Sequence, residues 1–119
     1  MSAEDDDAVR ELLDEGLTDW VPVDRVIGYA RDIAESTPSD YVEVASRLIV
    51  RLIRDGLMMP GDIGSGVFEA WGGTGESLIR RVIEDCRAKS WQPQGSGCWF
   101  LNTEEGDRLA SLGGASGSA

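Results

Sequence analysis

The chain of 119 residues contains no histidine. This absence excludes the Ser–His and Cys–His pairs that activate many catalytic nucleophiles, and it excludes zinc sites built on imidazole. An enzyme with this sequence would have to rely on carboxylates or on a cysteine such as Cys98. We rank that alternative last among three functions, and we expect no catalytic residue, no cofactor and no metal site.

Cysteine and long apolar runs are also scarce. The only cysteines, Cys86 and Cys98, form no C-x-x-C pattern, which favours two reduced thiols in a protein core over a disulfide or redox pair. No apolar run is long enough to span a membrane, and nothing in the first 30 residues resembles a signal peptide, because the acidic start over residues 1–7 has no apolar stretch. We therefore expect a soluble protein of the cytoplasm with no membrane contact.

Basic residues are the minority among the charges. Eleven Lys and Arg face 22 Asp and Glu, which gives a formal net charge of -11 and an isoelectric point near 4.2. The excess is concentrated in residues 1–37, where acidic side chains outnumber basic ones most strongly. A surface of this kind repels phosphate backbones and anionic lipids and attracts basic partners.

The length suits a single domain. We predict an acidic, disordered N-terminus over 1–6, one folded domain over 7–112, and a disordered tail over 113–119, where only Gly, Ala and Ser occur. Residues 113–119 therefore offer no apolar side chain larger than that of alanine to a core.

Apolar spacing and turn residues predict the elements of the domain. Helices are expected over 7–15, 24–35, 38–55 and 75–89, with Thr37 and Thr74 capping the last two. A first hairpin is expected from strands at 57–59 and 67–71, joined by the Gly-rich turn 60–66. Further short segments are an edge strand at 20–23, a second hairpin from 91–94 and 98–102, and a last helix capped by Thr103.

The order of these elements over residues 7–71 resembles the winged-helix pattern. The segment 47–57, a Leu-rich helix followed by Asp55-Gly56-Leu57, is similar to a recognition helix running into its wing. The turn Met59-Pro60-Gly61-Asp62 is also typical of that superfamily. The resemblance implies an α/β (α+β) fold that is winged-helix-like, to which the sequence adds an extra helix and a second small β-hairpin.

Winged helices bind DNA or proteins, so the resemblance leaves both functions open. As a DNA-binding regulator, the protein would place helix 38–55 in the major groove, with Arg47, Arg51 and Arg54 on the nucleic acid. Asp40 and Glu43 near the start of that helix would face phosphates, and the wing 61–66 has no basic residue. Nucleic acid is therefore an alternative partner that the charges disfavour.

The leading hypothesis is a non-catalytic, acidic protein-binding domain, in the manner of an immunity protein or antitoxin that inhibits a basic partner. Tryptophan is enriched among the residues that contribute most to binding at protein interfaces, so an exposed Trp would strengthen binding by an acidic surface. The residues predicted to bind protein are Asp5, Asp6, Asp7, Glu11, Asp14, Glu15, Trp71 and Trp91.

Overall fold

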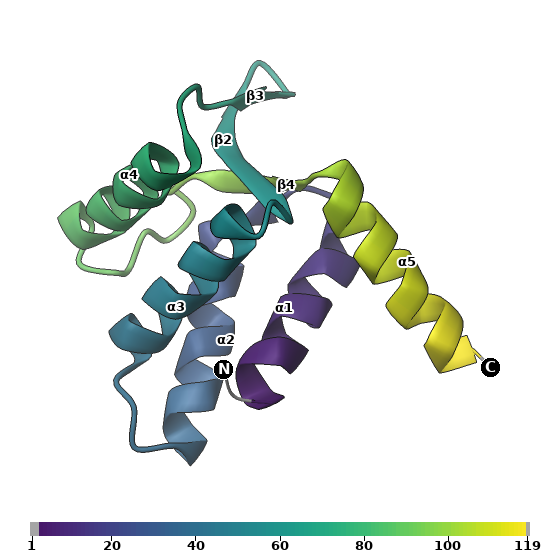
Figure 1. Ribbon diagram of the computed structural model, residues 1–119. Helices are drawn as coiled ribbons and strands as arrows, with labels where there is room; N and C mark the ends of the chain where they lie inside the picture. The colour runs from purple at the N-terminus through teal and green to yellow at the C-terminus, as the bar shows by residue number, and fades with distance from the viewer. Residues whose placement is uncertain (1–2, 119) are drawn as a thin grey trace.

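The computed structural model describes the backbone of residues 3–118 and the side chains of residues 3–112. Three helices lie side by side below a small sheet (Figure 1): α1 (Ala3–Gly16), α2 (Val23–Ser36) and α3 (Tyr41–Arg54). Helix α4 (Gly75–Ala88) packs against α3, and α5 (Glu104–Ser118) packs against α1. The two later helices therefore flank the three-helix layer on opposite sides.

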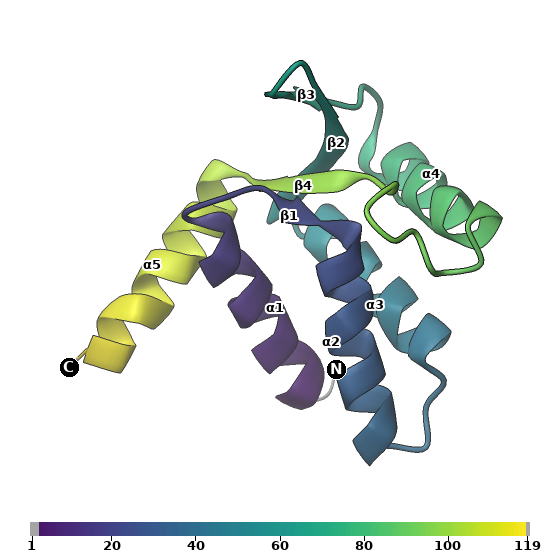
Figure 2. The same cartoon turned by 180° about the vertical axis from the view of Figure 1, so that it is seen from behind.

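The sheet has four antiparallel strands in the order β1-β4-β2-β3. These strands are β1 (Val21–Pro22), β2 (Met58–Gly64), β3 (Val67–Ala70) and β4 (Trp99–Asn102). Figure 2 shows β4 crossing between the short β1 and the base of β2. The β2–β3 hairpin turns at Ser65 and Gly66, whose φ angles of 53° and 79° suit a two-residue hairpin loop.

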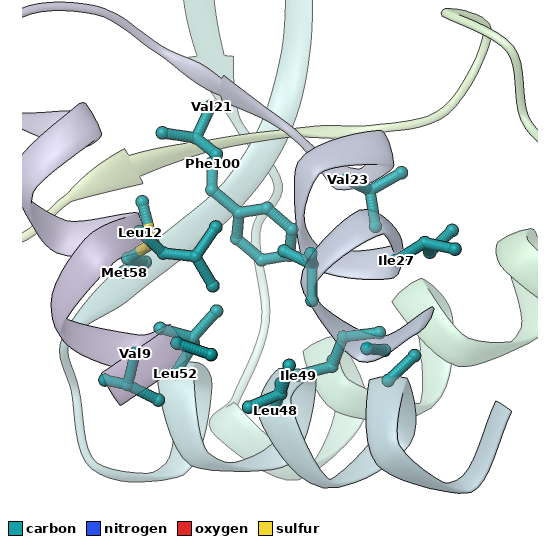
Figure 3. Packing of buried hydrophobic residues seen from close by; sticks show 14 of the residues in the cluster. Val9, Leu12, Val21, Val23, Ile27, Leu48, Ile49, Leu52, Met58 and Phe100 are labelled. Atoms are coloured by element: carbon teal, nitrogen blue, oxygen red, sulfur yellow. The ribbon is translucent and has the colours of Figure 1, made fainter. Parts of the chain in front are cut away.

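The core lies between the sheet and the three-helix layer. Phe100 of β4 is fully buried, opposite Val21 on one side and Pro60 on the other. Its ring points down into apolar side chains from all three helices (Figure 3). Burial of one such Leu, Ile or Phe side chain stabilises the fold by about 1.5–3 kcal/mol. The helical side chains around it include Val9, Leu12, Val23, Ile27, Leu48, Ile49 and Leu52.

Side-chain caps fix where the helices begin. Thr74 accepts a hydrogen bond from the Ser77 amide at 3.3 Å, which confirms the predicted cap of α4. Helix α3 differs from its prediction, because Asp40 and not Thr37 is the cap, with its Oδ1 accepting from the Val42 amide at 3.1 Å. Thr37 instead donates to the Ile33 carbonyl and closes the end of α2.

The α+β class is confirmed, and the order of elements over residues 3–70 is the predicted one. The second hairpin is wrong, because residues 91–94 form no strand. Trp91 and Gln94 there have φ angles of 57° and 50°, which an extended strand cannot adopt. Strand β4 pairs with β1 and β2 instead. The resemblance to the winged-helix superfamily itself stays a prediction.

Both ends of the described backbone are helical, and the predicted bounds of the folded domain and its disordered ends stay a prediction. Helix α1 already begins at Ala3, so residues 3–6 are helical, and the backbone of α5 continues to Ser118. Residues 1–2 and 119, also predicted to be disordered, lie outside the described residues. Among the helices described, none is both long enough and apolar enough to cross a membrane.

Candidate functional site

An acidic groove runs between α1 and α2. Glu4, Asp7 and Glu11 line it from α1, at a spacing of three and four residues that places them on one face of the helix. Tyr29 and Asp32 line it from α2. Its volume is about 240 Å³, which is room for one long side chain rather than for a large ligand.

The groove carboxylates have no counter-charge among the described side chains. All four of them (Glu4, Asp7, Glu11 and Asp32) are exposed, and none forms an ion pair within the part of the chain that the structure describes. The groove also includes Ala8 and Ile33, which are buried and apolar. Because apolar walls and a concave shape focus the field of like charges, the groove attracts a cation more strongly than a flat acidic surface would.

A charged network next to the groove holds α1 to α2. Arg25 donates to both carboxylate oxygens of Glu15, at 2.9 and 2.8 Å, and the Tyr29 hydroxyl donates to the same carboxylate. The hydrogen bond from Arg25 lowers the pKa of Glu15, while burial, followed by the hydrogen bond to Glu15, raises the pKa of Tyr29 to about 12. Glu15 therefore fixes the Tyr29 ring beside the groove and has its own charge matched by Arg25.

The predicted acidic residues other than Glu15, which pairs with Arg25, fall into four groups. Asp7 and Glu11 line the groove, as a docking surface requires, and Asp14 is exposed outside it. Asp6 pairs with Arg51. Asp5 is a correction: its side chain is fully buried against Arg47, so it faces the interior and not a partner.

Sequence reasoning missed two of the groove residues, Glu4 and Asp32. Glu4 continues the spacing of Asp7 and Glu11, so helical periodicity extended by one turn would have found it. Asp32 comes from α2, and only the packing of α1 against α2 brings it to the groove. No signal in the sequence alone pairs these two helix faces.

Neither predicted tryptophan lines the groove. Trp91 is a second correction, since only 7% of it is exposed and it cannot anchor a partner by its surface. Trp71 is half-buried beside the β2–β3 hairpin, where its indole Nε1 donates to Asp62 Oδ2 at 2.8 Å. The guanidinium of Arg81 lies 3.8 Å from the centre of the Trp71 ring, so one ring face is already covered.

Each arginine proposed for nucleic-acid binding holds a carboxylate from another helix. Arg47 contacts Asp5 of α1, with its Nε 3.0 Å from Oδ2, and Arg51 contacts Asp6. Arg54 contacts Glu76 of α4 through two hydrogen bonds of 3.0 and 2.9 Å, the main reason that its pKa is raised. A DNA phosphate would have to displace these carboxylates, which adds a cost to the alternative function.

The two thiols do not have the properties of a catalytic cysteine. Cys86 and Cys98 are both buried and unbridged. Burial raises the pKa of the Cys86 thiol to about 11 and raises that of Cys98 even more. A protonated thiol is a poor nucleophile. Within the described residues, no group of three or more Cys, Asp or Glu side chains is arranged to hold a metal ion.

Comparison of the chain with protein-family models, with curated proteins and with solved structures finds no match. Function is therefore inferred from the geometry and charge of the molecule itself.

Proposed function

We propose that this protein is a non-catalytic, acidic protein-binding domain that inhibits a basic partner, in the manner of an immunity protein or antitoxin. The observation that carries the proposal is the α1–α2 groove, whose four exposed carboxylates have no cationic partner among the described residues. The buried, unbridged cysteines are in keeping with a cytoplasmic protein.

The groove suits a lysine or arginine side chain of the partner. The aliphatic stem of such a side chain can lie along Ala8 and Ile33, while its charged head reaches the carboxylates of Asp7, Glu11 and Asp32. Inhibition requires only that the partner's basic, active surface be covered. It does not require the acidic protein to carry any catalytic group.

The high net charge would act at longer range than the groove. A net charge of -11, concentrated in the N-terminal third, steers a cationic partner toward α1 and α2 before contact is made. Salt screens such steering, since the Debye length falls from about 30 Å at 0.01 M to about 3 Å at 1 M. Association is therefore expected to be fast at low ionic strength and several-fold slower at high ionic strength.

The proposal is tested by capture of partners from a lysate of the native host, with protein and nucleic acid both analysed in the eluate. The tagged wild-type protein is compared with a groove variant, Asp7→Lys with Glu11→Lys. The matched control is Glu69→Lys with Glu84→Lys, which reverses two exposed and unpaired carboxylates on β3 and α4. Both double variants have the same net charge, so they differ only in where the charge changes.

We expect the wild type and the control to retain a basic protein at low salt and release it at high salt, and the groove variant to retain little of it. The isolated partner should then associate several-fold more slowly with the groove variant than with the control. Equal losses in both variants would contradict the groove. Recovery of nucleic acid that persists after protein is removed would favour the winged-helix regulator instead.

A further inference from the structure

Strand β3 leaves one edge of the sheet open. It is the last strand in the order β1-β4-β2-β3, and among the described elements it packs extensively against β2 alone. The β2–β3 hairpin stands above the rest of the sheet (Figures 1 and 2). Its outer strand is accessible to solvent, since Val67 is 60% exposed, Glu69 and Ala70 are exposed, and Phe68 is partly exposed.

The hydrogen-bond pattern of the hairpin determines which backbone groups face this open edge. The residues on either side of its two-residue loop form a hydrogen-bonded pair, so β3 bonds to β2 through Val67 and every second residue after it. The Trp71 amide, which donates to the Pro60 carbonyl at 3.0 Å, follows the same alternation. The N–H and C=O groups of Phe68 and Ala70 therefore point away from β2, and no hydrogen bond within the described structure uses them.

The sequence of β3 does not block the addition of another strand. Exposed sheet edges are commonly protected by a proline, a lysine or a bulge. The strand at the opposite edge, β1, has two residues, one of which is Pro22. Strand β3 is Val67–Ala70, with neither proline nor lysine, and its register with β2 is continuous. A short extended segment can therefore pair with the four free backbone groups of Phe68 and Ala70.

On the face of the sheet away from the helices, an added strand would meet apolar side chains. Phe68 lies opposite Ile63 of β2, and the centres of the Phe68 and Trp20 rings are 6.3 Å apart. A Cβ on Gly61 would lie 2.8 Å from the Phe68 ring, so this ring leans across β2 where β2 has no side chain. All three apolar side chains are partly exposed, and none of them packs against the core. This face therefore favours apolar residues in the added strand.

The other face of the hairpin carries two carboxylates. Asp62 and Glu69 are directly opposite in register, both are exposed, and neither forms an ion pair among the described residues. A Cβ on Gly64 would lie 2.9 Å from Glu69 Oε2, so the Glu69 side chain extends over β2. Neighbouring strands are about 4.8 Å apart. A basic residue of the added strand must therefore have the length of lysine or arginine to cross β3 and reach this carboxylate.

A second copy of the chain fits this edge less well. If two β3 strands paired through all of their free backbone groups, the two Glu69 side chains would lie directly opposite each other. Like charges in that position are destabilising. The net charge of -11 adds further repulsion between copies. The charges therefore favour a basic strand of another protein over self-association.

We propose that the open edge of β3 binds an extended peptide segment of another protein by strand addition. Apolar residues of the segment lie opposite Phe68 and Ala70, and a lysine or arginine between them lies opposite Glu69. The backbone of the segment bonds to the free groups of Phe68 and Ala70, while its alternating side chains provide sequence specificity. The site is separate from the acidic groove, so it goes beyond the proposed inhibitory function.

The test is a titration of the isotope-labelled full chain with the acetylated and amidated peptide T-V-K-V-T to millimolar concentration, followed by NMR. We expect saturable shifts of the Phe68, Glu69 and Ala70 amide signals. The Phe68 and Ala70 amides should also exchange with solvent about tenfold more slowly at a peptide concentration about ten times its Kd. The peptide T-V-E-V-T, which places a second carboxylate near Glu69, should bind at least about fivefold more weakly.

Methylated peptides separate strand addition from simple charge attraction. N-methyl groups on both valines remove the donors that face β3 and should abolish binding, whereas an N-methyl group on the central lysine, whose N–H points away from β3, should be tolerated. On the protein, Ala70→Pro removes one outward N–H without breaking the β2–β3 ladder, and it should weaken binding at least about tenfold. Glu69→Lys keeps the backbone groups and should lose the preference for the lysine peptide over the glutamate peptide.

The acidic groove provides an independent control. Its variant Asp7→Lys with Glu11→Lys should bind T-V-K-V-T within about twofold of the wild type, so failure of the proposed function would leave this result unchanged. Absence of saturable shifts, equal binding of the lysine and glutamate peptides, or undiminished binding of the valine-methylated peptide would each overturn the proposal. Protection of the Phe68 and Ala70 amides without peptide, lost on dilution, would also overturn it and would assign the edge to a second copy of the chain.

Discussion

Asp5 of α1 and Arg47 of α3 form an ion pair in which the carboxylate is fully buried and the arginine side chain is 38% exposed. Two hydrogen bonds join them, from Nε to Oδ2 at 3.0 Å and from a terminal guanidinium nitrogen to Oδ1 at 3.4 Å. The pair connects residues 42 positions apart in the sequence. The first turn of α1 is therefore docked on α3 by a charge contact as well as by its apolar stripe.

Removal of the arginine from this pair should destabilise the protein. Arg47→Met keeps most of the aliphatic stem but takes away the guanidinium that both Asp5 oxygens contact, so we expect a loss of about 2–4 kcal/mol in the free energy of unfolding. Arg80→Met, at an exposed arginine of α4, should change it by less than about 0.5 kcal/mol. Urea unfolding of the two variants measures the difference, and equal effects would show that the buried pair adds nothing.

Two helical glycines should respond to alanine in opposite directions. Gly28→Ala should stabilise the protein by about 1 kcal/mol, because it improves helix propensity and its Cβ meets only open space. Gly106→Ala should destabilise it by several kcal/mol, since a Cβ there would lie 2.1 Å from the Leu57 carbonyl oxygen and force α5 away from β2. Thermal unfolding distinguishes them, and a stable Gly106→Ala protein would contradict the close approach.

Stability at alkaline pH should depend on Tyr29. Burial, followed by the hydrogen bond to Glu15, raises the pKa of Tyr29 from 10.0 to about 12 in the folded protein. A raised pKa means that the folded state holds the proton more tightly than the unfolded state. The resulting stabilisation is complete below pH 10 and is lost as the pH rises from 10 toward 12.

The measurement compares the wild type with Tyr29→Phe by urea unfolding across this range. The wild type should lose more stability between pH 10 and 12 than Tyr29→Phe, which has no proton to lose at this site. Glu15 should affect stability at the opposite end of the pH range. Because its pKa is lowered in the folded protein, its contribution to the free energy of unfolding is lost as the pH falls below 4.5. Parallel alkaline curves for the two proteins would contradict the tyrosine assignment.

Both thiols should resist modification in the folded protein. Cys86 and Cys98 are about 1% exposed, and burial raises the pKa of both thiols, to about 11 for Cys86. An aromatic disulfide reagent near neutral pH should therefore release no thiol signal from the native protein and two equivalents after unfolding in urea. Rapid reaction of either cysteine in the native state would show that the core around β4 opens readily.

Local features of the fold were predictable from the sequence, and long-range ones were not. The apolar stripe of α3 and the Thr74 cap of α4 are encoded within a few residues, and both were placed correctly within about three positions. Strand β4 was given the wrong partner because pairing depends on contacts far apart in the chain. Ser90, Trp91 and Gln94 have left-handed backbone conformations, which prevent a strand over residues 91–94. None of the three is a glycine, so nothing in the sequence indicated these conformations.

The candidate site was predictable only in part, for the same reason. Asp7 and Glu11 follow from acidic composition and helical spacing, but Asp32 reaches the groove through the packing of α2 on α1. The counter-ions of Asp5 and Asp6 come from α3, more than 40 residues away, so composition alone overstated the acidic charge available to a partner. Net charge sets the sign of a surface, and packing decides which charges remain on it.

The position of β4 bears on how the chain folds as it is made. Among the described strands, β1 pairs with β4 alone, and β4 also separates it from β2, so the sheet cannot close until residues 99–102 have left the ribosome. Asn102 at the end of β4 then donates to the Leu13 carbonyl at 2.9 Å and ties the last strand to the first helix. Before β4 is added, β2 can cover part of the apolar face of the three-helix layer through Met58, and the part that packs on Phe100 stays uncovered.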